Sequence, residues 1–240
     1  VTKGLNPDAP MKDSGIEWLG EIPAHWDIAK LFYGARLQSG YAFSSGDFGN
    51  EGVPVVRMNN LNRGSVDLSE AVRIPESACN SSVALGPGDL LWGMSGSVGE
   101  TGSLGNFAVV AEADIPCQLN QRVGRFLVHQ DRMDHGFLRT WIQSQPFYQQ
   151  IMLAVTGTAQ FNVSAEQVQS TMTAFPPLDE QSRIVAYVSS VSGRFDSLIK
   201  EAQAAITLLQ ERRAALISAG VTGKIDVRSL VQASHELDLA

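Results

Sequence analysis

Cysteine is scarce in this sequence, and long apolar runs are missing from it. Its 240 residues include two cysteines, Cys79 and Cys117, which form no C-x-x-C pair and could make at most one bridge. This excludes a disulfide-rich scaffold and a zinc knuckle, and we expect both thiols to be reduced. No stretch reaches the roughly 18 apolar residues of a membrane span, and residues 1–7 lack the apolar core of a signal peptide. We therefore expect a globular, cytoplasmic protein with no membrane partner.

Positive charge is also in short supply. Lys and Arg together number 18 against 25 Asp and Glu, which gives a formal net charge of −7. This balance argues against a broad, sequence-independent clamp on nucleic acid, although it leaves room for local readout. Residues 25–178 hold nine basic residues against 13 acidic ones, and eight of the nine are arginine, whose planar fork suits flat acceptors. These arginines are either ordinary surface residues or part of a recognition surface.

The motifs of common catalytic sites are incomplete. Residues 223–225 place Ile after Gly-Lys, where a phosphate-binding loop needs Ser or Thr. Residues 93–97 approach the turn that carries a hydrolase nucleophile, with Ser95 as the candidate, but Ser97 stands where that turn needs glycine. Residues 175–178 are not the tetrapeptide with which a methyltransferase holds a flipped base. Metal-ligand spacing is missing among the four histidines, His25, His129, His135 and His235. We predict no catalytic residue and no metal site, with a hydrolase that uses Ser95 as an alternative.

The pattern along the chain changes from strand-like to helical. Residues 30–130 alternate short β-rich runs with turn signals, such as the Gly and Pro at 86–88, which predicts a compact strand-rich domain. From residue 137 to 153, apolar residues recur at three- and four-residue spacings, broken only by Pro146, so we expect one kinked helix or two short ones. The predicted class is α+β, a strand-rich globular domain followed by a long protruding helix. The predicted parts are a connector at 1–11, the domain at 12–178, the helix at 179–219 and a tail at 220–240.

The most regular pattern is that of the long helix. After the prolines at 176–177, Asp179 can cap a helix start, and apart from Gly193 no proline or glycine interrupts the chain before Gly220. Apolar and small residues step by four and three along it, with Arg212 as the exception: Ile184, Val188, Val191, Phe195, Leu198, Ala202, Ala205, Leu209 and Leu216. Such a seam predicts a helix roughly 60 Å long that packs against a partner helix, in cis or in trans. The alternative is an amphipathic helix that lies on its own domain.

Three short segments of the strand-rich domain are rich in side chains that suit base edges. Arginine can form two parallel hydrogen bonds with guanine, and Asn or Gln can do so with adenine. The candidate DNA-binding residues are Arg57, Asn59, Asn60, Arg63, Gln121, Arg122, Thr158, Gln160 and Asn162. Loops are also built from such residues, because their side chains stabilise turns. Base readout and turn formation are therefore both open for the Asn and Gln residues.

Six segments of the chain have distinctive sequences. They are residues 11–26 (MKDSGIEWLGEIPAHW), 88–91 (GDLL), 120–121 (NQ), 156–164 (TGTAQFNVS), 175–181 (FPPLDEQ) and 211–225 (ERRAALISAGVTGKI). In this order and at this spacing they resemble the target recognition domain and central helix of specificity subunits from type I restriction-modification systems. The resemblance covers about residues 1–228. It implies a backbone or structural role for Gly157 and Gln160, which lie in a segment that the family shares.

The resemblance implies a non-catalytic subunit that reads one half of a bipartite DNA target. A full-length member carries two recognition domains, each followed by a long helix, and the two helices pack antiparallel as a spacer between the half-sites. This chain has one of each. Residues 1–7 resemble the connector that leaves the first helix, so the chain looks like a C-terminal half, whether as an expressed fragment, a split-gene product or a natural half-subunit. A helix seam without its partner then predicts a dimer of the chain.

Partners and cofactors follow from the same resemblance. The implied partners are double-stranded DNA, modification (methyltransferase) subunits and a restriction subunit, in a bacterial or archaeal cytoplasm. S-adenosylmethionine would bind the modification subunit, and ATP and Mg the restriction subunit, so we expect no cofactor in this chain. Because the recognition domain is net negative, we expect weak DNA binding alone and tighter binding with modification subunits. The alternative is a coiled-coil interaction module without DNA readout.

Overall fold

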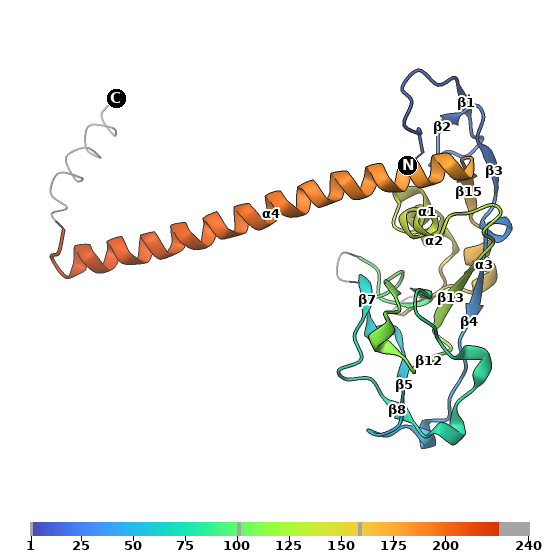
Figure 1. Ribbon diagram of the computed structural model, residues 1–240, viewed down its shortest axis with the longest axis horizontal. Helices are drawn as coiled ribbons and strands as arrows, with labels where there is room; N and C mark the ends of the chain where they lie inside the picture. The colour runs from blue at the N-terminus through green and yellow to red at the C-terminus, as the bar shows by residue number, and fades with distance from the viewer. Residues whose placement is uncertain (1, 100–101, 158–159, 226–240) are drawn as a thin grey trace. The chain divides into compact units, whose positions relative to one another are not determined.

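The computed structural model describes residues 2–99, 102–157 and 160–225. The chain divides into two units, one that ends at Val185 and one that begins at Ala186. The first unit holds the strands and three short helices, and the long helix α4 (Leu178–Val221) starts in it and continues into the second unit (Figure 1). This arrangement confirms the predicted α+β class, a strand-rich domain followed by a long helix.

The largest sheet has six strands in the order β4-β13-β9-β11-β7-β6. Neighbouring strands are antiparallel except for β11 and β7, which are parallel. The strands are β4 (Ala35–Ser39), β13 (Val123–Val128), β9 (Leu90–Gly93), β11 (Phe107–Val109), β7 (Gly64–Val66) and β6 (Leu61–Asn62). All four residues of β9 are buried, as expected for a short, continuous apolar run inside a core. β9 ends at Gly93, and the next residue, Met94, forms backbone hydrogen bonds with Arg122 and Val163.

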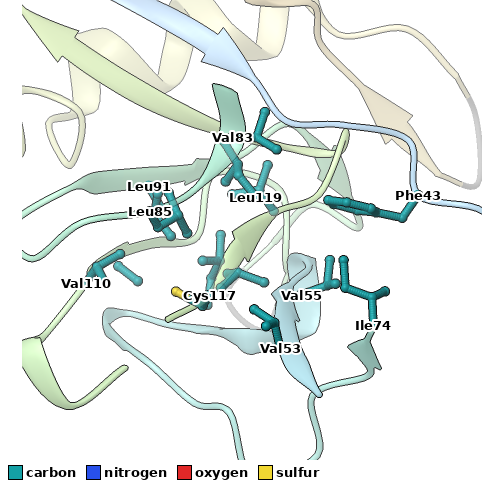
Figure 2. Close-up of a cluster of buried hydrophobic side chains, with 14 residues drawn as sticks. Phe43, Val53, Val55, Ile74, Val83, Leu85, Leu91, Val110, Cys117 and Leu119 are labelled. Carbon is teal, nitrogen blue, oxygen red and sulfur yellow. The ribbon is translucent and has the colours of Figure 1, made fainter. Parts of the chain in front are cut away.

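A second sheet has three strands, β12 (Gln118–Leu119), β5 (Val53–Val56) and β8 (Arg73–Ile74). β5 and β12 are parallel, with Val55 opposite Gln118 and Val56 opposite Leu119. Figure 2 shows the apolar cluster to which these strands contribute, with Val55, Cys117 and Leu119 among its buried side chains. Because parallel strands end at the same edge of a sheet, this pairing decides which loops of the first unit meet.

Short strand pairs and 3-10 turns complete the first unit. The pairs are β1 (Met11–Asp13) with β2 (Glu21–Pro23), β3 (Asp27–Lys30) with β15 (Met172–Phe175), and β10 (Ser95–Gly96) with β14 (Phe161–Asn162). The turns are η1 (Leu31–Tyr33), η2 (Ser45–Asp47), η3 (Met58–Asn60), η4 (Glu76–Ala78), η5 (Ser81–Val83) and η6 (Glu112–Asp114). Ser95 is buried within strand β10. A hydrolase nucleophile needs an exposed turn from a strand into a helix, so the alternative based on Ser95 is not supported.

The helical pattern at 137–153 forms two short helices, which is one of the two predicted outcomes. The short helices of the first unit are α1 (His135–Trp141), α2 (Gln145–Ala154) and α3 (Ala165–Gln169). The side chains of Asp134 and Ser144 cap α1 and α2, because each accepts a hydrogen bond from a backbone N–H in the first turn. Pro146 lies in the first turn of α2, where no intrahelical N–H is needed.

Helix α4 has 44 residues and begins and ends within two residues of the predicted limits. The prediction that Asp179 caps the helix was wrong, since the helix already begins at Leu178 and Asp179 lies in its first turn. An acidic residue there still favours the helix, because the first turn carries a partial positive charge. Gln181 and Ile184 are buried, so the start of α4 belongs to the core of the first unit. In the described part of the chain, none of the helices combines the length and the apolar character needed to cross a membrane.

Both cysteines are free thiols, as predicted. Cys117 is buried in the core, and this burial raises the pKa of its thiol to about 12. Burial also raises the pKa of Cys79, which is partly exposed. Cys117 therefore acts as a small apolar core residue rather than as a reactive thiol.

Candidate nucleic-acid interface

Two of the three predicted polar segments meet at one edge of the parallel pair β5–β12. Arg57 follows β5 and Asn120 follows β12, so both leave the sheet on the same side. The Asn120 amide donates a hydrogen bond to the Val56 carbonyl at 3.1 Å, which holds the two strand ends together. Gln121 and Arg122 come next in the chain and are exposed. The parallel pairing thus brings together residues that are more than sixty positions apart in the sequence.

The third segment joins them through backbone hydrogen bonds of Met94, which precedes β10, and Val163, which follows β14. The Met94 amide donates to the Arg122 carbonyl at 3.0 Å, and the Val163 amide donates to the Met94 carbonyl at 3.0 Å. The chain at 122 is therefore connected through residue 94 to the chain at 163. We call residues 57–60, 120–122 and 160–163 the loop cluster.

Arg122 and Asn162 are in direct contact within the loop cluster. Arg122 Nη1 donates to Asn162 Oδ1 at 3.0 Å, and Asn162 Nδ2 donates to the Gln160 carbonyl at 3.2 Å. A guanidinium has five N–H donors, so the exposed Arg122 can also bind an acceptor from outside. Asn162 therefore positions Arg122, a role that its place in the sequence did not indicate.

The polar residues at turn η3 differ in burial and in role. Asn60 is 2% exposed, its Oδ1 accepts from the Arg57 amide at 2.9 Å, and its Nδ2 donates to the Asp67 carbonyl at 2.9 Å. The side chain of Asn60 therefore stabilises the turn, which is one of the two roles that its sequence left open. Asn59 is exposed. Arg57 is half-buried with its guanidinium 6.0 Å from the Phe48 ring centroid, in range of a cation–π contact.

Arg63 lies outside the loop cluster, at the tip of the β6–β7 hairpin. Asn62 is opposite Ser65, so Arg63 and Gly64 form a two-residue turn, with φ of +37° and +123°. Such turns favour Asn, Asp or Gly, and a positive φ strains other residues by about 1–2 kcal/mol. A strained arginine on an exposed tip is a candidate functional residue. It also lines an open hollow of about 580 Å³ together with Trp92.

Gly157 shapes the loop that precedes β14. Its φ is +105°, and a Cβ atom there would lie 2.3 Å from the Gln160 carbonyl oxygen. Only glycine fits this position, which agrees with the backbone role that the motif implies. Gln160 has an exposed side chain, while its carbonyl accepts from Asn162. Thr158 lies outside the described residues, so its predicted role stays a prediction.

Sequence reasoning missed Tyr41, which is hydrogen-bonded to the segment that enters the loop cluster. Its amide donates to the Leu119 carbonyl at 2.9 Å, and its carbonyl accepts from the Gln121 amide at 3.0 Å. Its exposed ring packs edge-on against Phe43, with the ring centroids 5.1 Å apart. A lone tyrosine carries no sequence signal. The close approach at Gly40, where a Cβ atom would clash with the backbone of residues 119–120, becomes visible only in the fold.

The loop cluster is a set of side-chain hydrogen-bond donors and acceptors on segments that backbone hydrogen bonds connect. Among residues 2–99, 102–157 and 160–225, no group of three or more His, Cys, Asp or Glu could hold a metal ion. Arginine, glutamine and an exposed tyrosine suit recognition of flat polar groups, such as base edges. The arrangement therefore fits binding and discrimination.

The predicted helix–helix seam lies along α4. Ile184 is buried, Val188 and Val191 are half-buried, and the other members are exposed, namely Phe195, Leu198, Ala202, Ala205, Leu209 and Leu216. A second apolar row that sequence reasoning missed runs beside the seam at Ile199, Ile206 and Ile217, which are exposed as well. Such a wide apolar stripe favours packing against another helix. The role of these residues in an interface stays a prediction.

The chain thus combines a strand-rich domain that carries a polar loop cluster with a long helix that carries an apolar seam. Comparison with known proteins identifies the family. Residues 27–208 match the model of the type I restriction modification DNA specificity domain, and the chain belongs to this family. This confirms the resemblance that the sequence motifs indicated.

Curated relatives are specificity subunits of type I restriction enzymes. The MjaVIII specificity subunit of Methanocaldococcus jannaschii is 26% identical over 231 residues, which are 95% of this chain and 52% of the relative. The EcoBI specificity subunit of Escherichia coli is 27% identical over 231 residues, which are 94% of this chain and 45% of the relative. The chain thus spans about half the length of these relatives.

Solved structures share the fold. A chain from a structure on complex assembly and conformational transition of the type I R-M system superposes with a TM-score of 0.62 at 19% identity, covering 90% of this chain and 48% of that one. The HsdS subunit from Thermoanaerobacter tengcongensis gives a TM-score of 0.54 at 18% identity, covering 73% of this chain and 44% of that one. At this level of identity the likeness establishes the architecture.

Proposed function

We propose that this chain is a DNA sequence-specificity subunit, or half of one, that reads one half of a bipartite target in a type I restriction-modification enzyme. Family membership supports this setting. The observation that carries the DNA-reading role is the loop cluster, in which Arg122 is exposed and held by Asn162, with Gln121 beside it. Side chains that neighbouring residues position by hydrogen bonds can discriminate base edges in the major groove.

Partner subunits would supply most of the contacts with phosphates. Residues 25–178 carry nine basic and 13 acidic residues, so this region repels DNA at long range. Phosphate contacts contribute much of the affinity of DNA-binding proteins, whereas base contacts give specificity. Docked modification subunits with positive surfaces would therefore convert weak binding by this chain into tight binding.

Helix α4 would set the distance between two recognition domains. Its 44 residues span about 66 Å at 1.5 Å per residue. The apolar seam would pair with a similar helix, either from a second copy of this chain or from the other half of a longer subunit. A self-dimer would be two-fold symmetric and would place one recognition domain at each end.

The catalytic steps would belong to partner subunits in a bacterial or archaeal cytoplasm. The modification subunit would bind S-adenosylmethionine, and the restriction subunit would bind ATP and Mg. The role of this chain would be to select the DNA on which these subunits act.

The test is sequence-specific methylation by this chain combined with its modification subunit. Methylated bases mapped on a DNA library should define one bipartite sequence. Arg122→Ala should weaken binding to that sequence by about 1–3 kcal/mol and relax the preference at one base pair. Arg122→Lys keeps the positive charge but lacks the planar guanidinium. Compared with Arg122→Ala, it should therefore regain contacts with phosphates but not the preference for one base pair.

Arg139→Ala, which changes an exposed arginine on α1, is the matched control and should behave as the wild type. A complex that assembles but shows no sequence preference would favour the alternative, an assembly module without DNA readout.

A further inference from the structure

Helix α2 presents an apolar surface that the first unit leaves uncovered. Leu153 is 73% exposed, and Tyr148 is exposed on the same helix. The sequence of α2, QPFYQQIMLA, contains no charged residue, whereas the outer side of a surface helix is usually charged or polar. Trp18, from the loop between β1 and β2, lines the same hollows as Leu153. We call Trp18, Tyr148, Met152 and Leu153 the α2 face.

Two open hollows flank the α2 face. One has a volume of about 420 Å³ and extends from Trp18 and Leu153 to α3, and the other has about 620 Å³ and is lined by Trp18, Tyr148, Met152 and Leu153. Trp18 and Leu153 line both hollows, so they form a ridge between them. The Trp18 Nε1 atom is buried and has no hydrogen-bond partner within the described residues. A ridge between two hollows suits a helix whose apolar side chains recur at three- and four-residue spacings.

The charges at the hollows are negative. Glu17 and Glu166 are the charged residues among those that line them. The backbone N–H of Glu166 and the hydroxyl of Ser164 lower the pKa of the Glu166 carboxyl, so it is ionised at neutral pH. Two carboxylates beside an apolar ridge complement an apolar stripe with Lys or Arg next to it.

Other occupants fit this surface poorly. DNA phosphates would meet the two carboxylates. The same face of a second copy would place glutamates against glutamates. Residues 226–240 of this chain carry three acidic residues against one arginine, which is the same sign of charge as the border of the hollows. A basic amphipathic helix from a different protein is the occupant that satisfies both the apolar surface and the charge.

We propose that the α2 face docks an amphipathic helix of the modification subunit that carries Lys or Arg beside its apolar stripe. This inference rests on the proposed function, which supplies that subunit as partner. It adds a docking surface made of other residues than the loop cluster and the α4 seam. Assembly would then depend on the recognition domain itself as well as on the long helix.

The experiment is a titration of the purified modification subunit with the full chain, followed by calorimetry at low and high salt. Leu153→Glu should weaken binding at least about tenfold, because it buries a charge beside two carboxylates. Glu166→Lys should weaken binding several-fold at low salt, and the loss should shrink at high salt. Leu127→Glu changes a leucine that is 42% exposed in β13, and it is the matched control that should bind as the wild type.

The outcomes separate this inference from the proposed function. If the wild type and Leu153→Glu bind the modification subunit with equal affinity, the docking surface is overturned and the proposed function is unaffected. Wild-type chain that binds no modification subunit would overturn the proposed function and the inference with it. A lower mass of the Leu153→Glu chain alone would show that the occupant is a second copy, which overturns the partner proposed. Unchanged thermal unfolding of Leu153→Glu shows that the variant is folded.

Discussion

The indole N–H of Trp26 donates a 3.0 Å hydrogen bond to the carboxylate of Glu180, 154 positions later in the chain. Trp26 is fully buried, and Glu180 lies in the first turn of α4. The His25 ring nitrogen Nε2 lies 2.7 Å from the same carboxylate oxygen. These contacts tie the segment at 11–26 to the start of the long helix.

Glu180→Ala should lower the free energy of unfolding of the first unit by about 1–3 kcal/mol, because it leaves a buried donor without its acceptor. The His25 pair should add little, since its ring is about half exposed and solvent screens the interaction. Urea unfolding followed by tryptophan fluorescence measures the loss. Glu201→Ala, at an exposed position of the same helix, should have no effect. An equal loss in both variants would contradict the role of this bond.

At position 63, a comparison of Arg63→Gly with Arg63→Ala should reveal the backbone strain of the hairpin tip. Both variants remove the arginine side chain beyond Cβ, but only alanine keeps the steric cost of φ +37°. The glycine variant should therefore be more stable than the alanine variant by about 1 kcal/mol. Thermal unfolding of the two variants checks this difference. Equal stability would mean that the turn relaxes without strain.

The thiol of Cys117 should react slowly and make stability depend on alkaline pH. Burial raises its pKa to about 12, helped by the negative charges of Asp114 and Asp89. The folded state therefore keeps a proton that the unfolded state loses near the ordinary thiol pKa of 9.0. The stabilisation is fully present below pH 9 and is lost as the pH rises from 9 toward 12.

Two measurements check the Cys117 prediction. A thiol reagent should modify the partly exposed Cys79 first, and Cys117 only as fast as the chain opens. Urea unfolding above pH 9 should show a steeper loss of stability in the wild type than in Cys117→Ala. Two thiols that react at the same rate in the native protein would argue against the burial.

The helices could be predicted from the sequence because their signals are local. A stretch with Gly193 as its only interruption and a repeated apolar seam placed α4 within two residues at both ends. Pro146 indicated the break between α1 and α2, since proline fits the first turn of a helix but not its interior. The first residue of α4 was predicted one position too late, at Asp179. The Gln181 amide donates a hydrogen bond to the Pro177 carbonyl, so the helix already begins at Leu178.

The candidate site could be predicted only as separate segments. The segments that hold Arg57 and Arg122 leave the sheet at the same edge because β5 and β12 pair in parallel. Such pairing depends on contacts between distant residues that no local pattern encodes. The buried Asn60 side chain also donates a hydrogen bond to the carbonyl of Asp67, seven positions later, and no local pattern indicates this contact. Asn59 and Asn60 look alike in the sequence, yet one is exposed and the other is buried in a turn.

The seam of α4 makes a prediction about oligomeric state. Light scattering during size exclusion should give the chain alone a mass near twice 25.9 kDa across about tenfold dilution. Leu198→Asp should give monomers, because it would bury a charge without a partner in the helix pair. Thr207→Asp, nine residues along and on the opposite side of the helix, should leave the dimer intact. A dimer that survives Leu198→Asp would place its interface elsewhere, whereas a wild-type monomer would mean that the seam pairs with another half-subunit or a modification subunit.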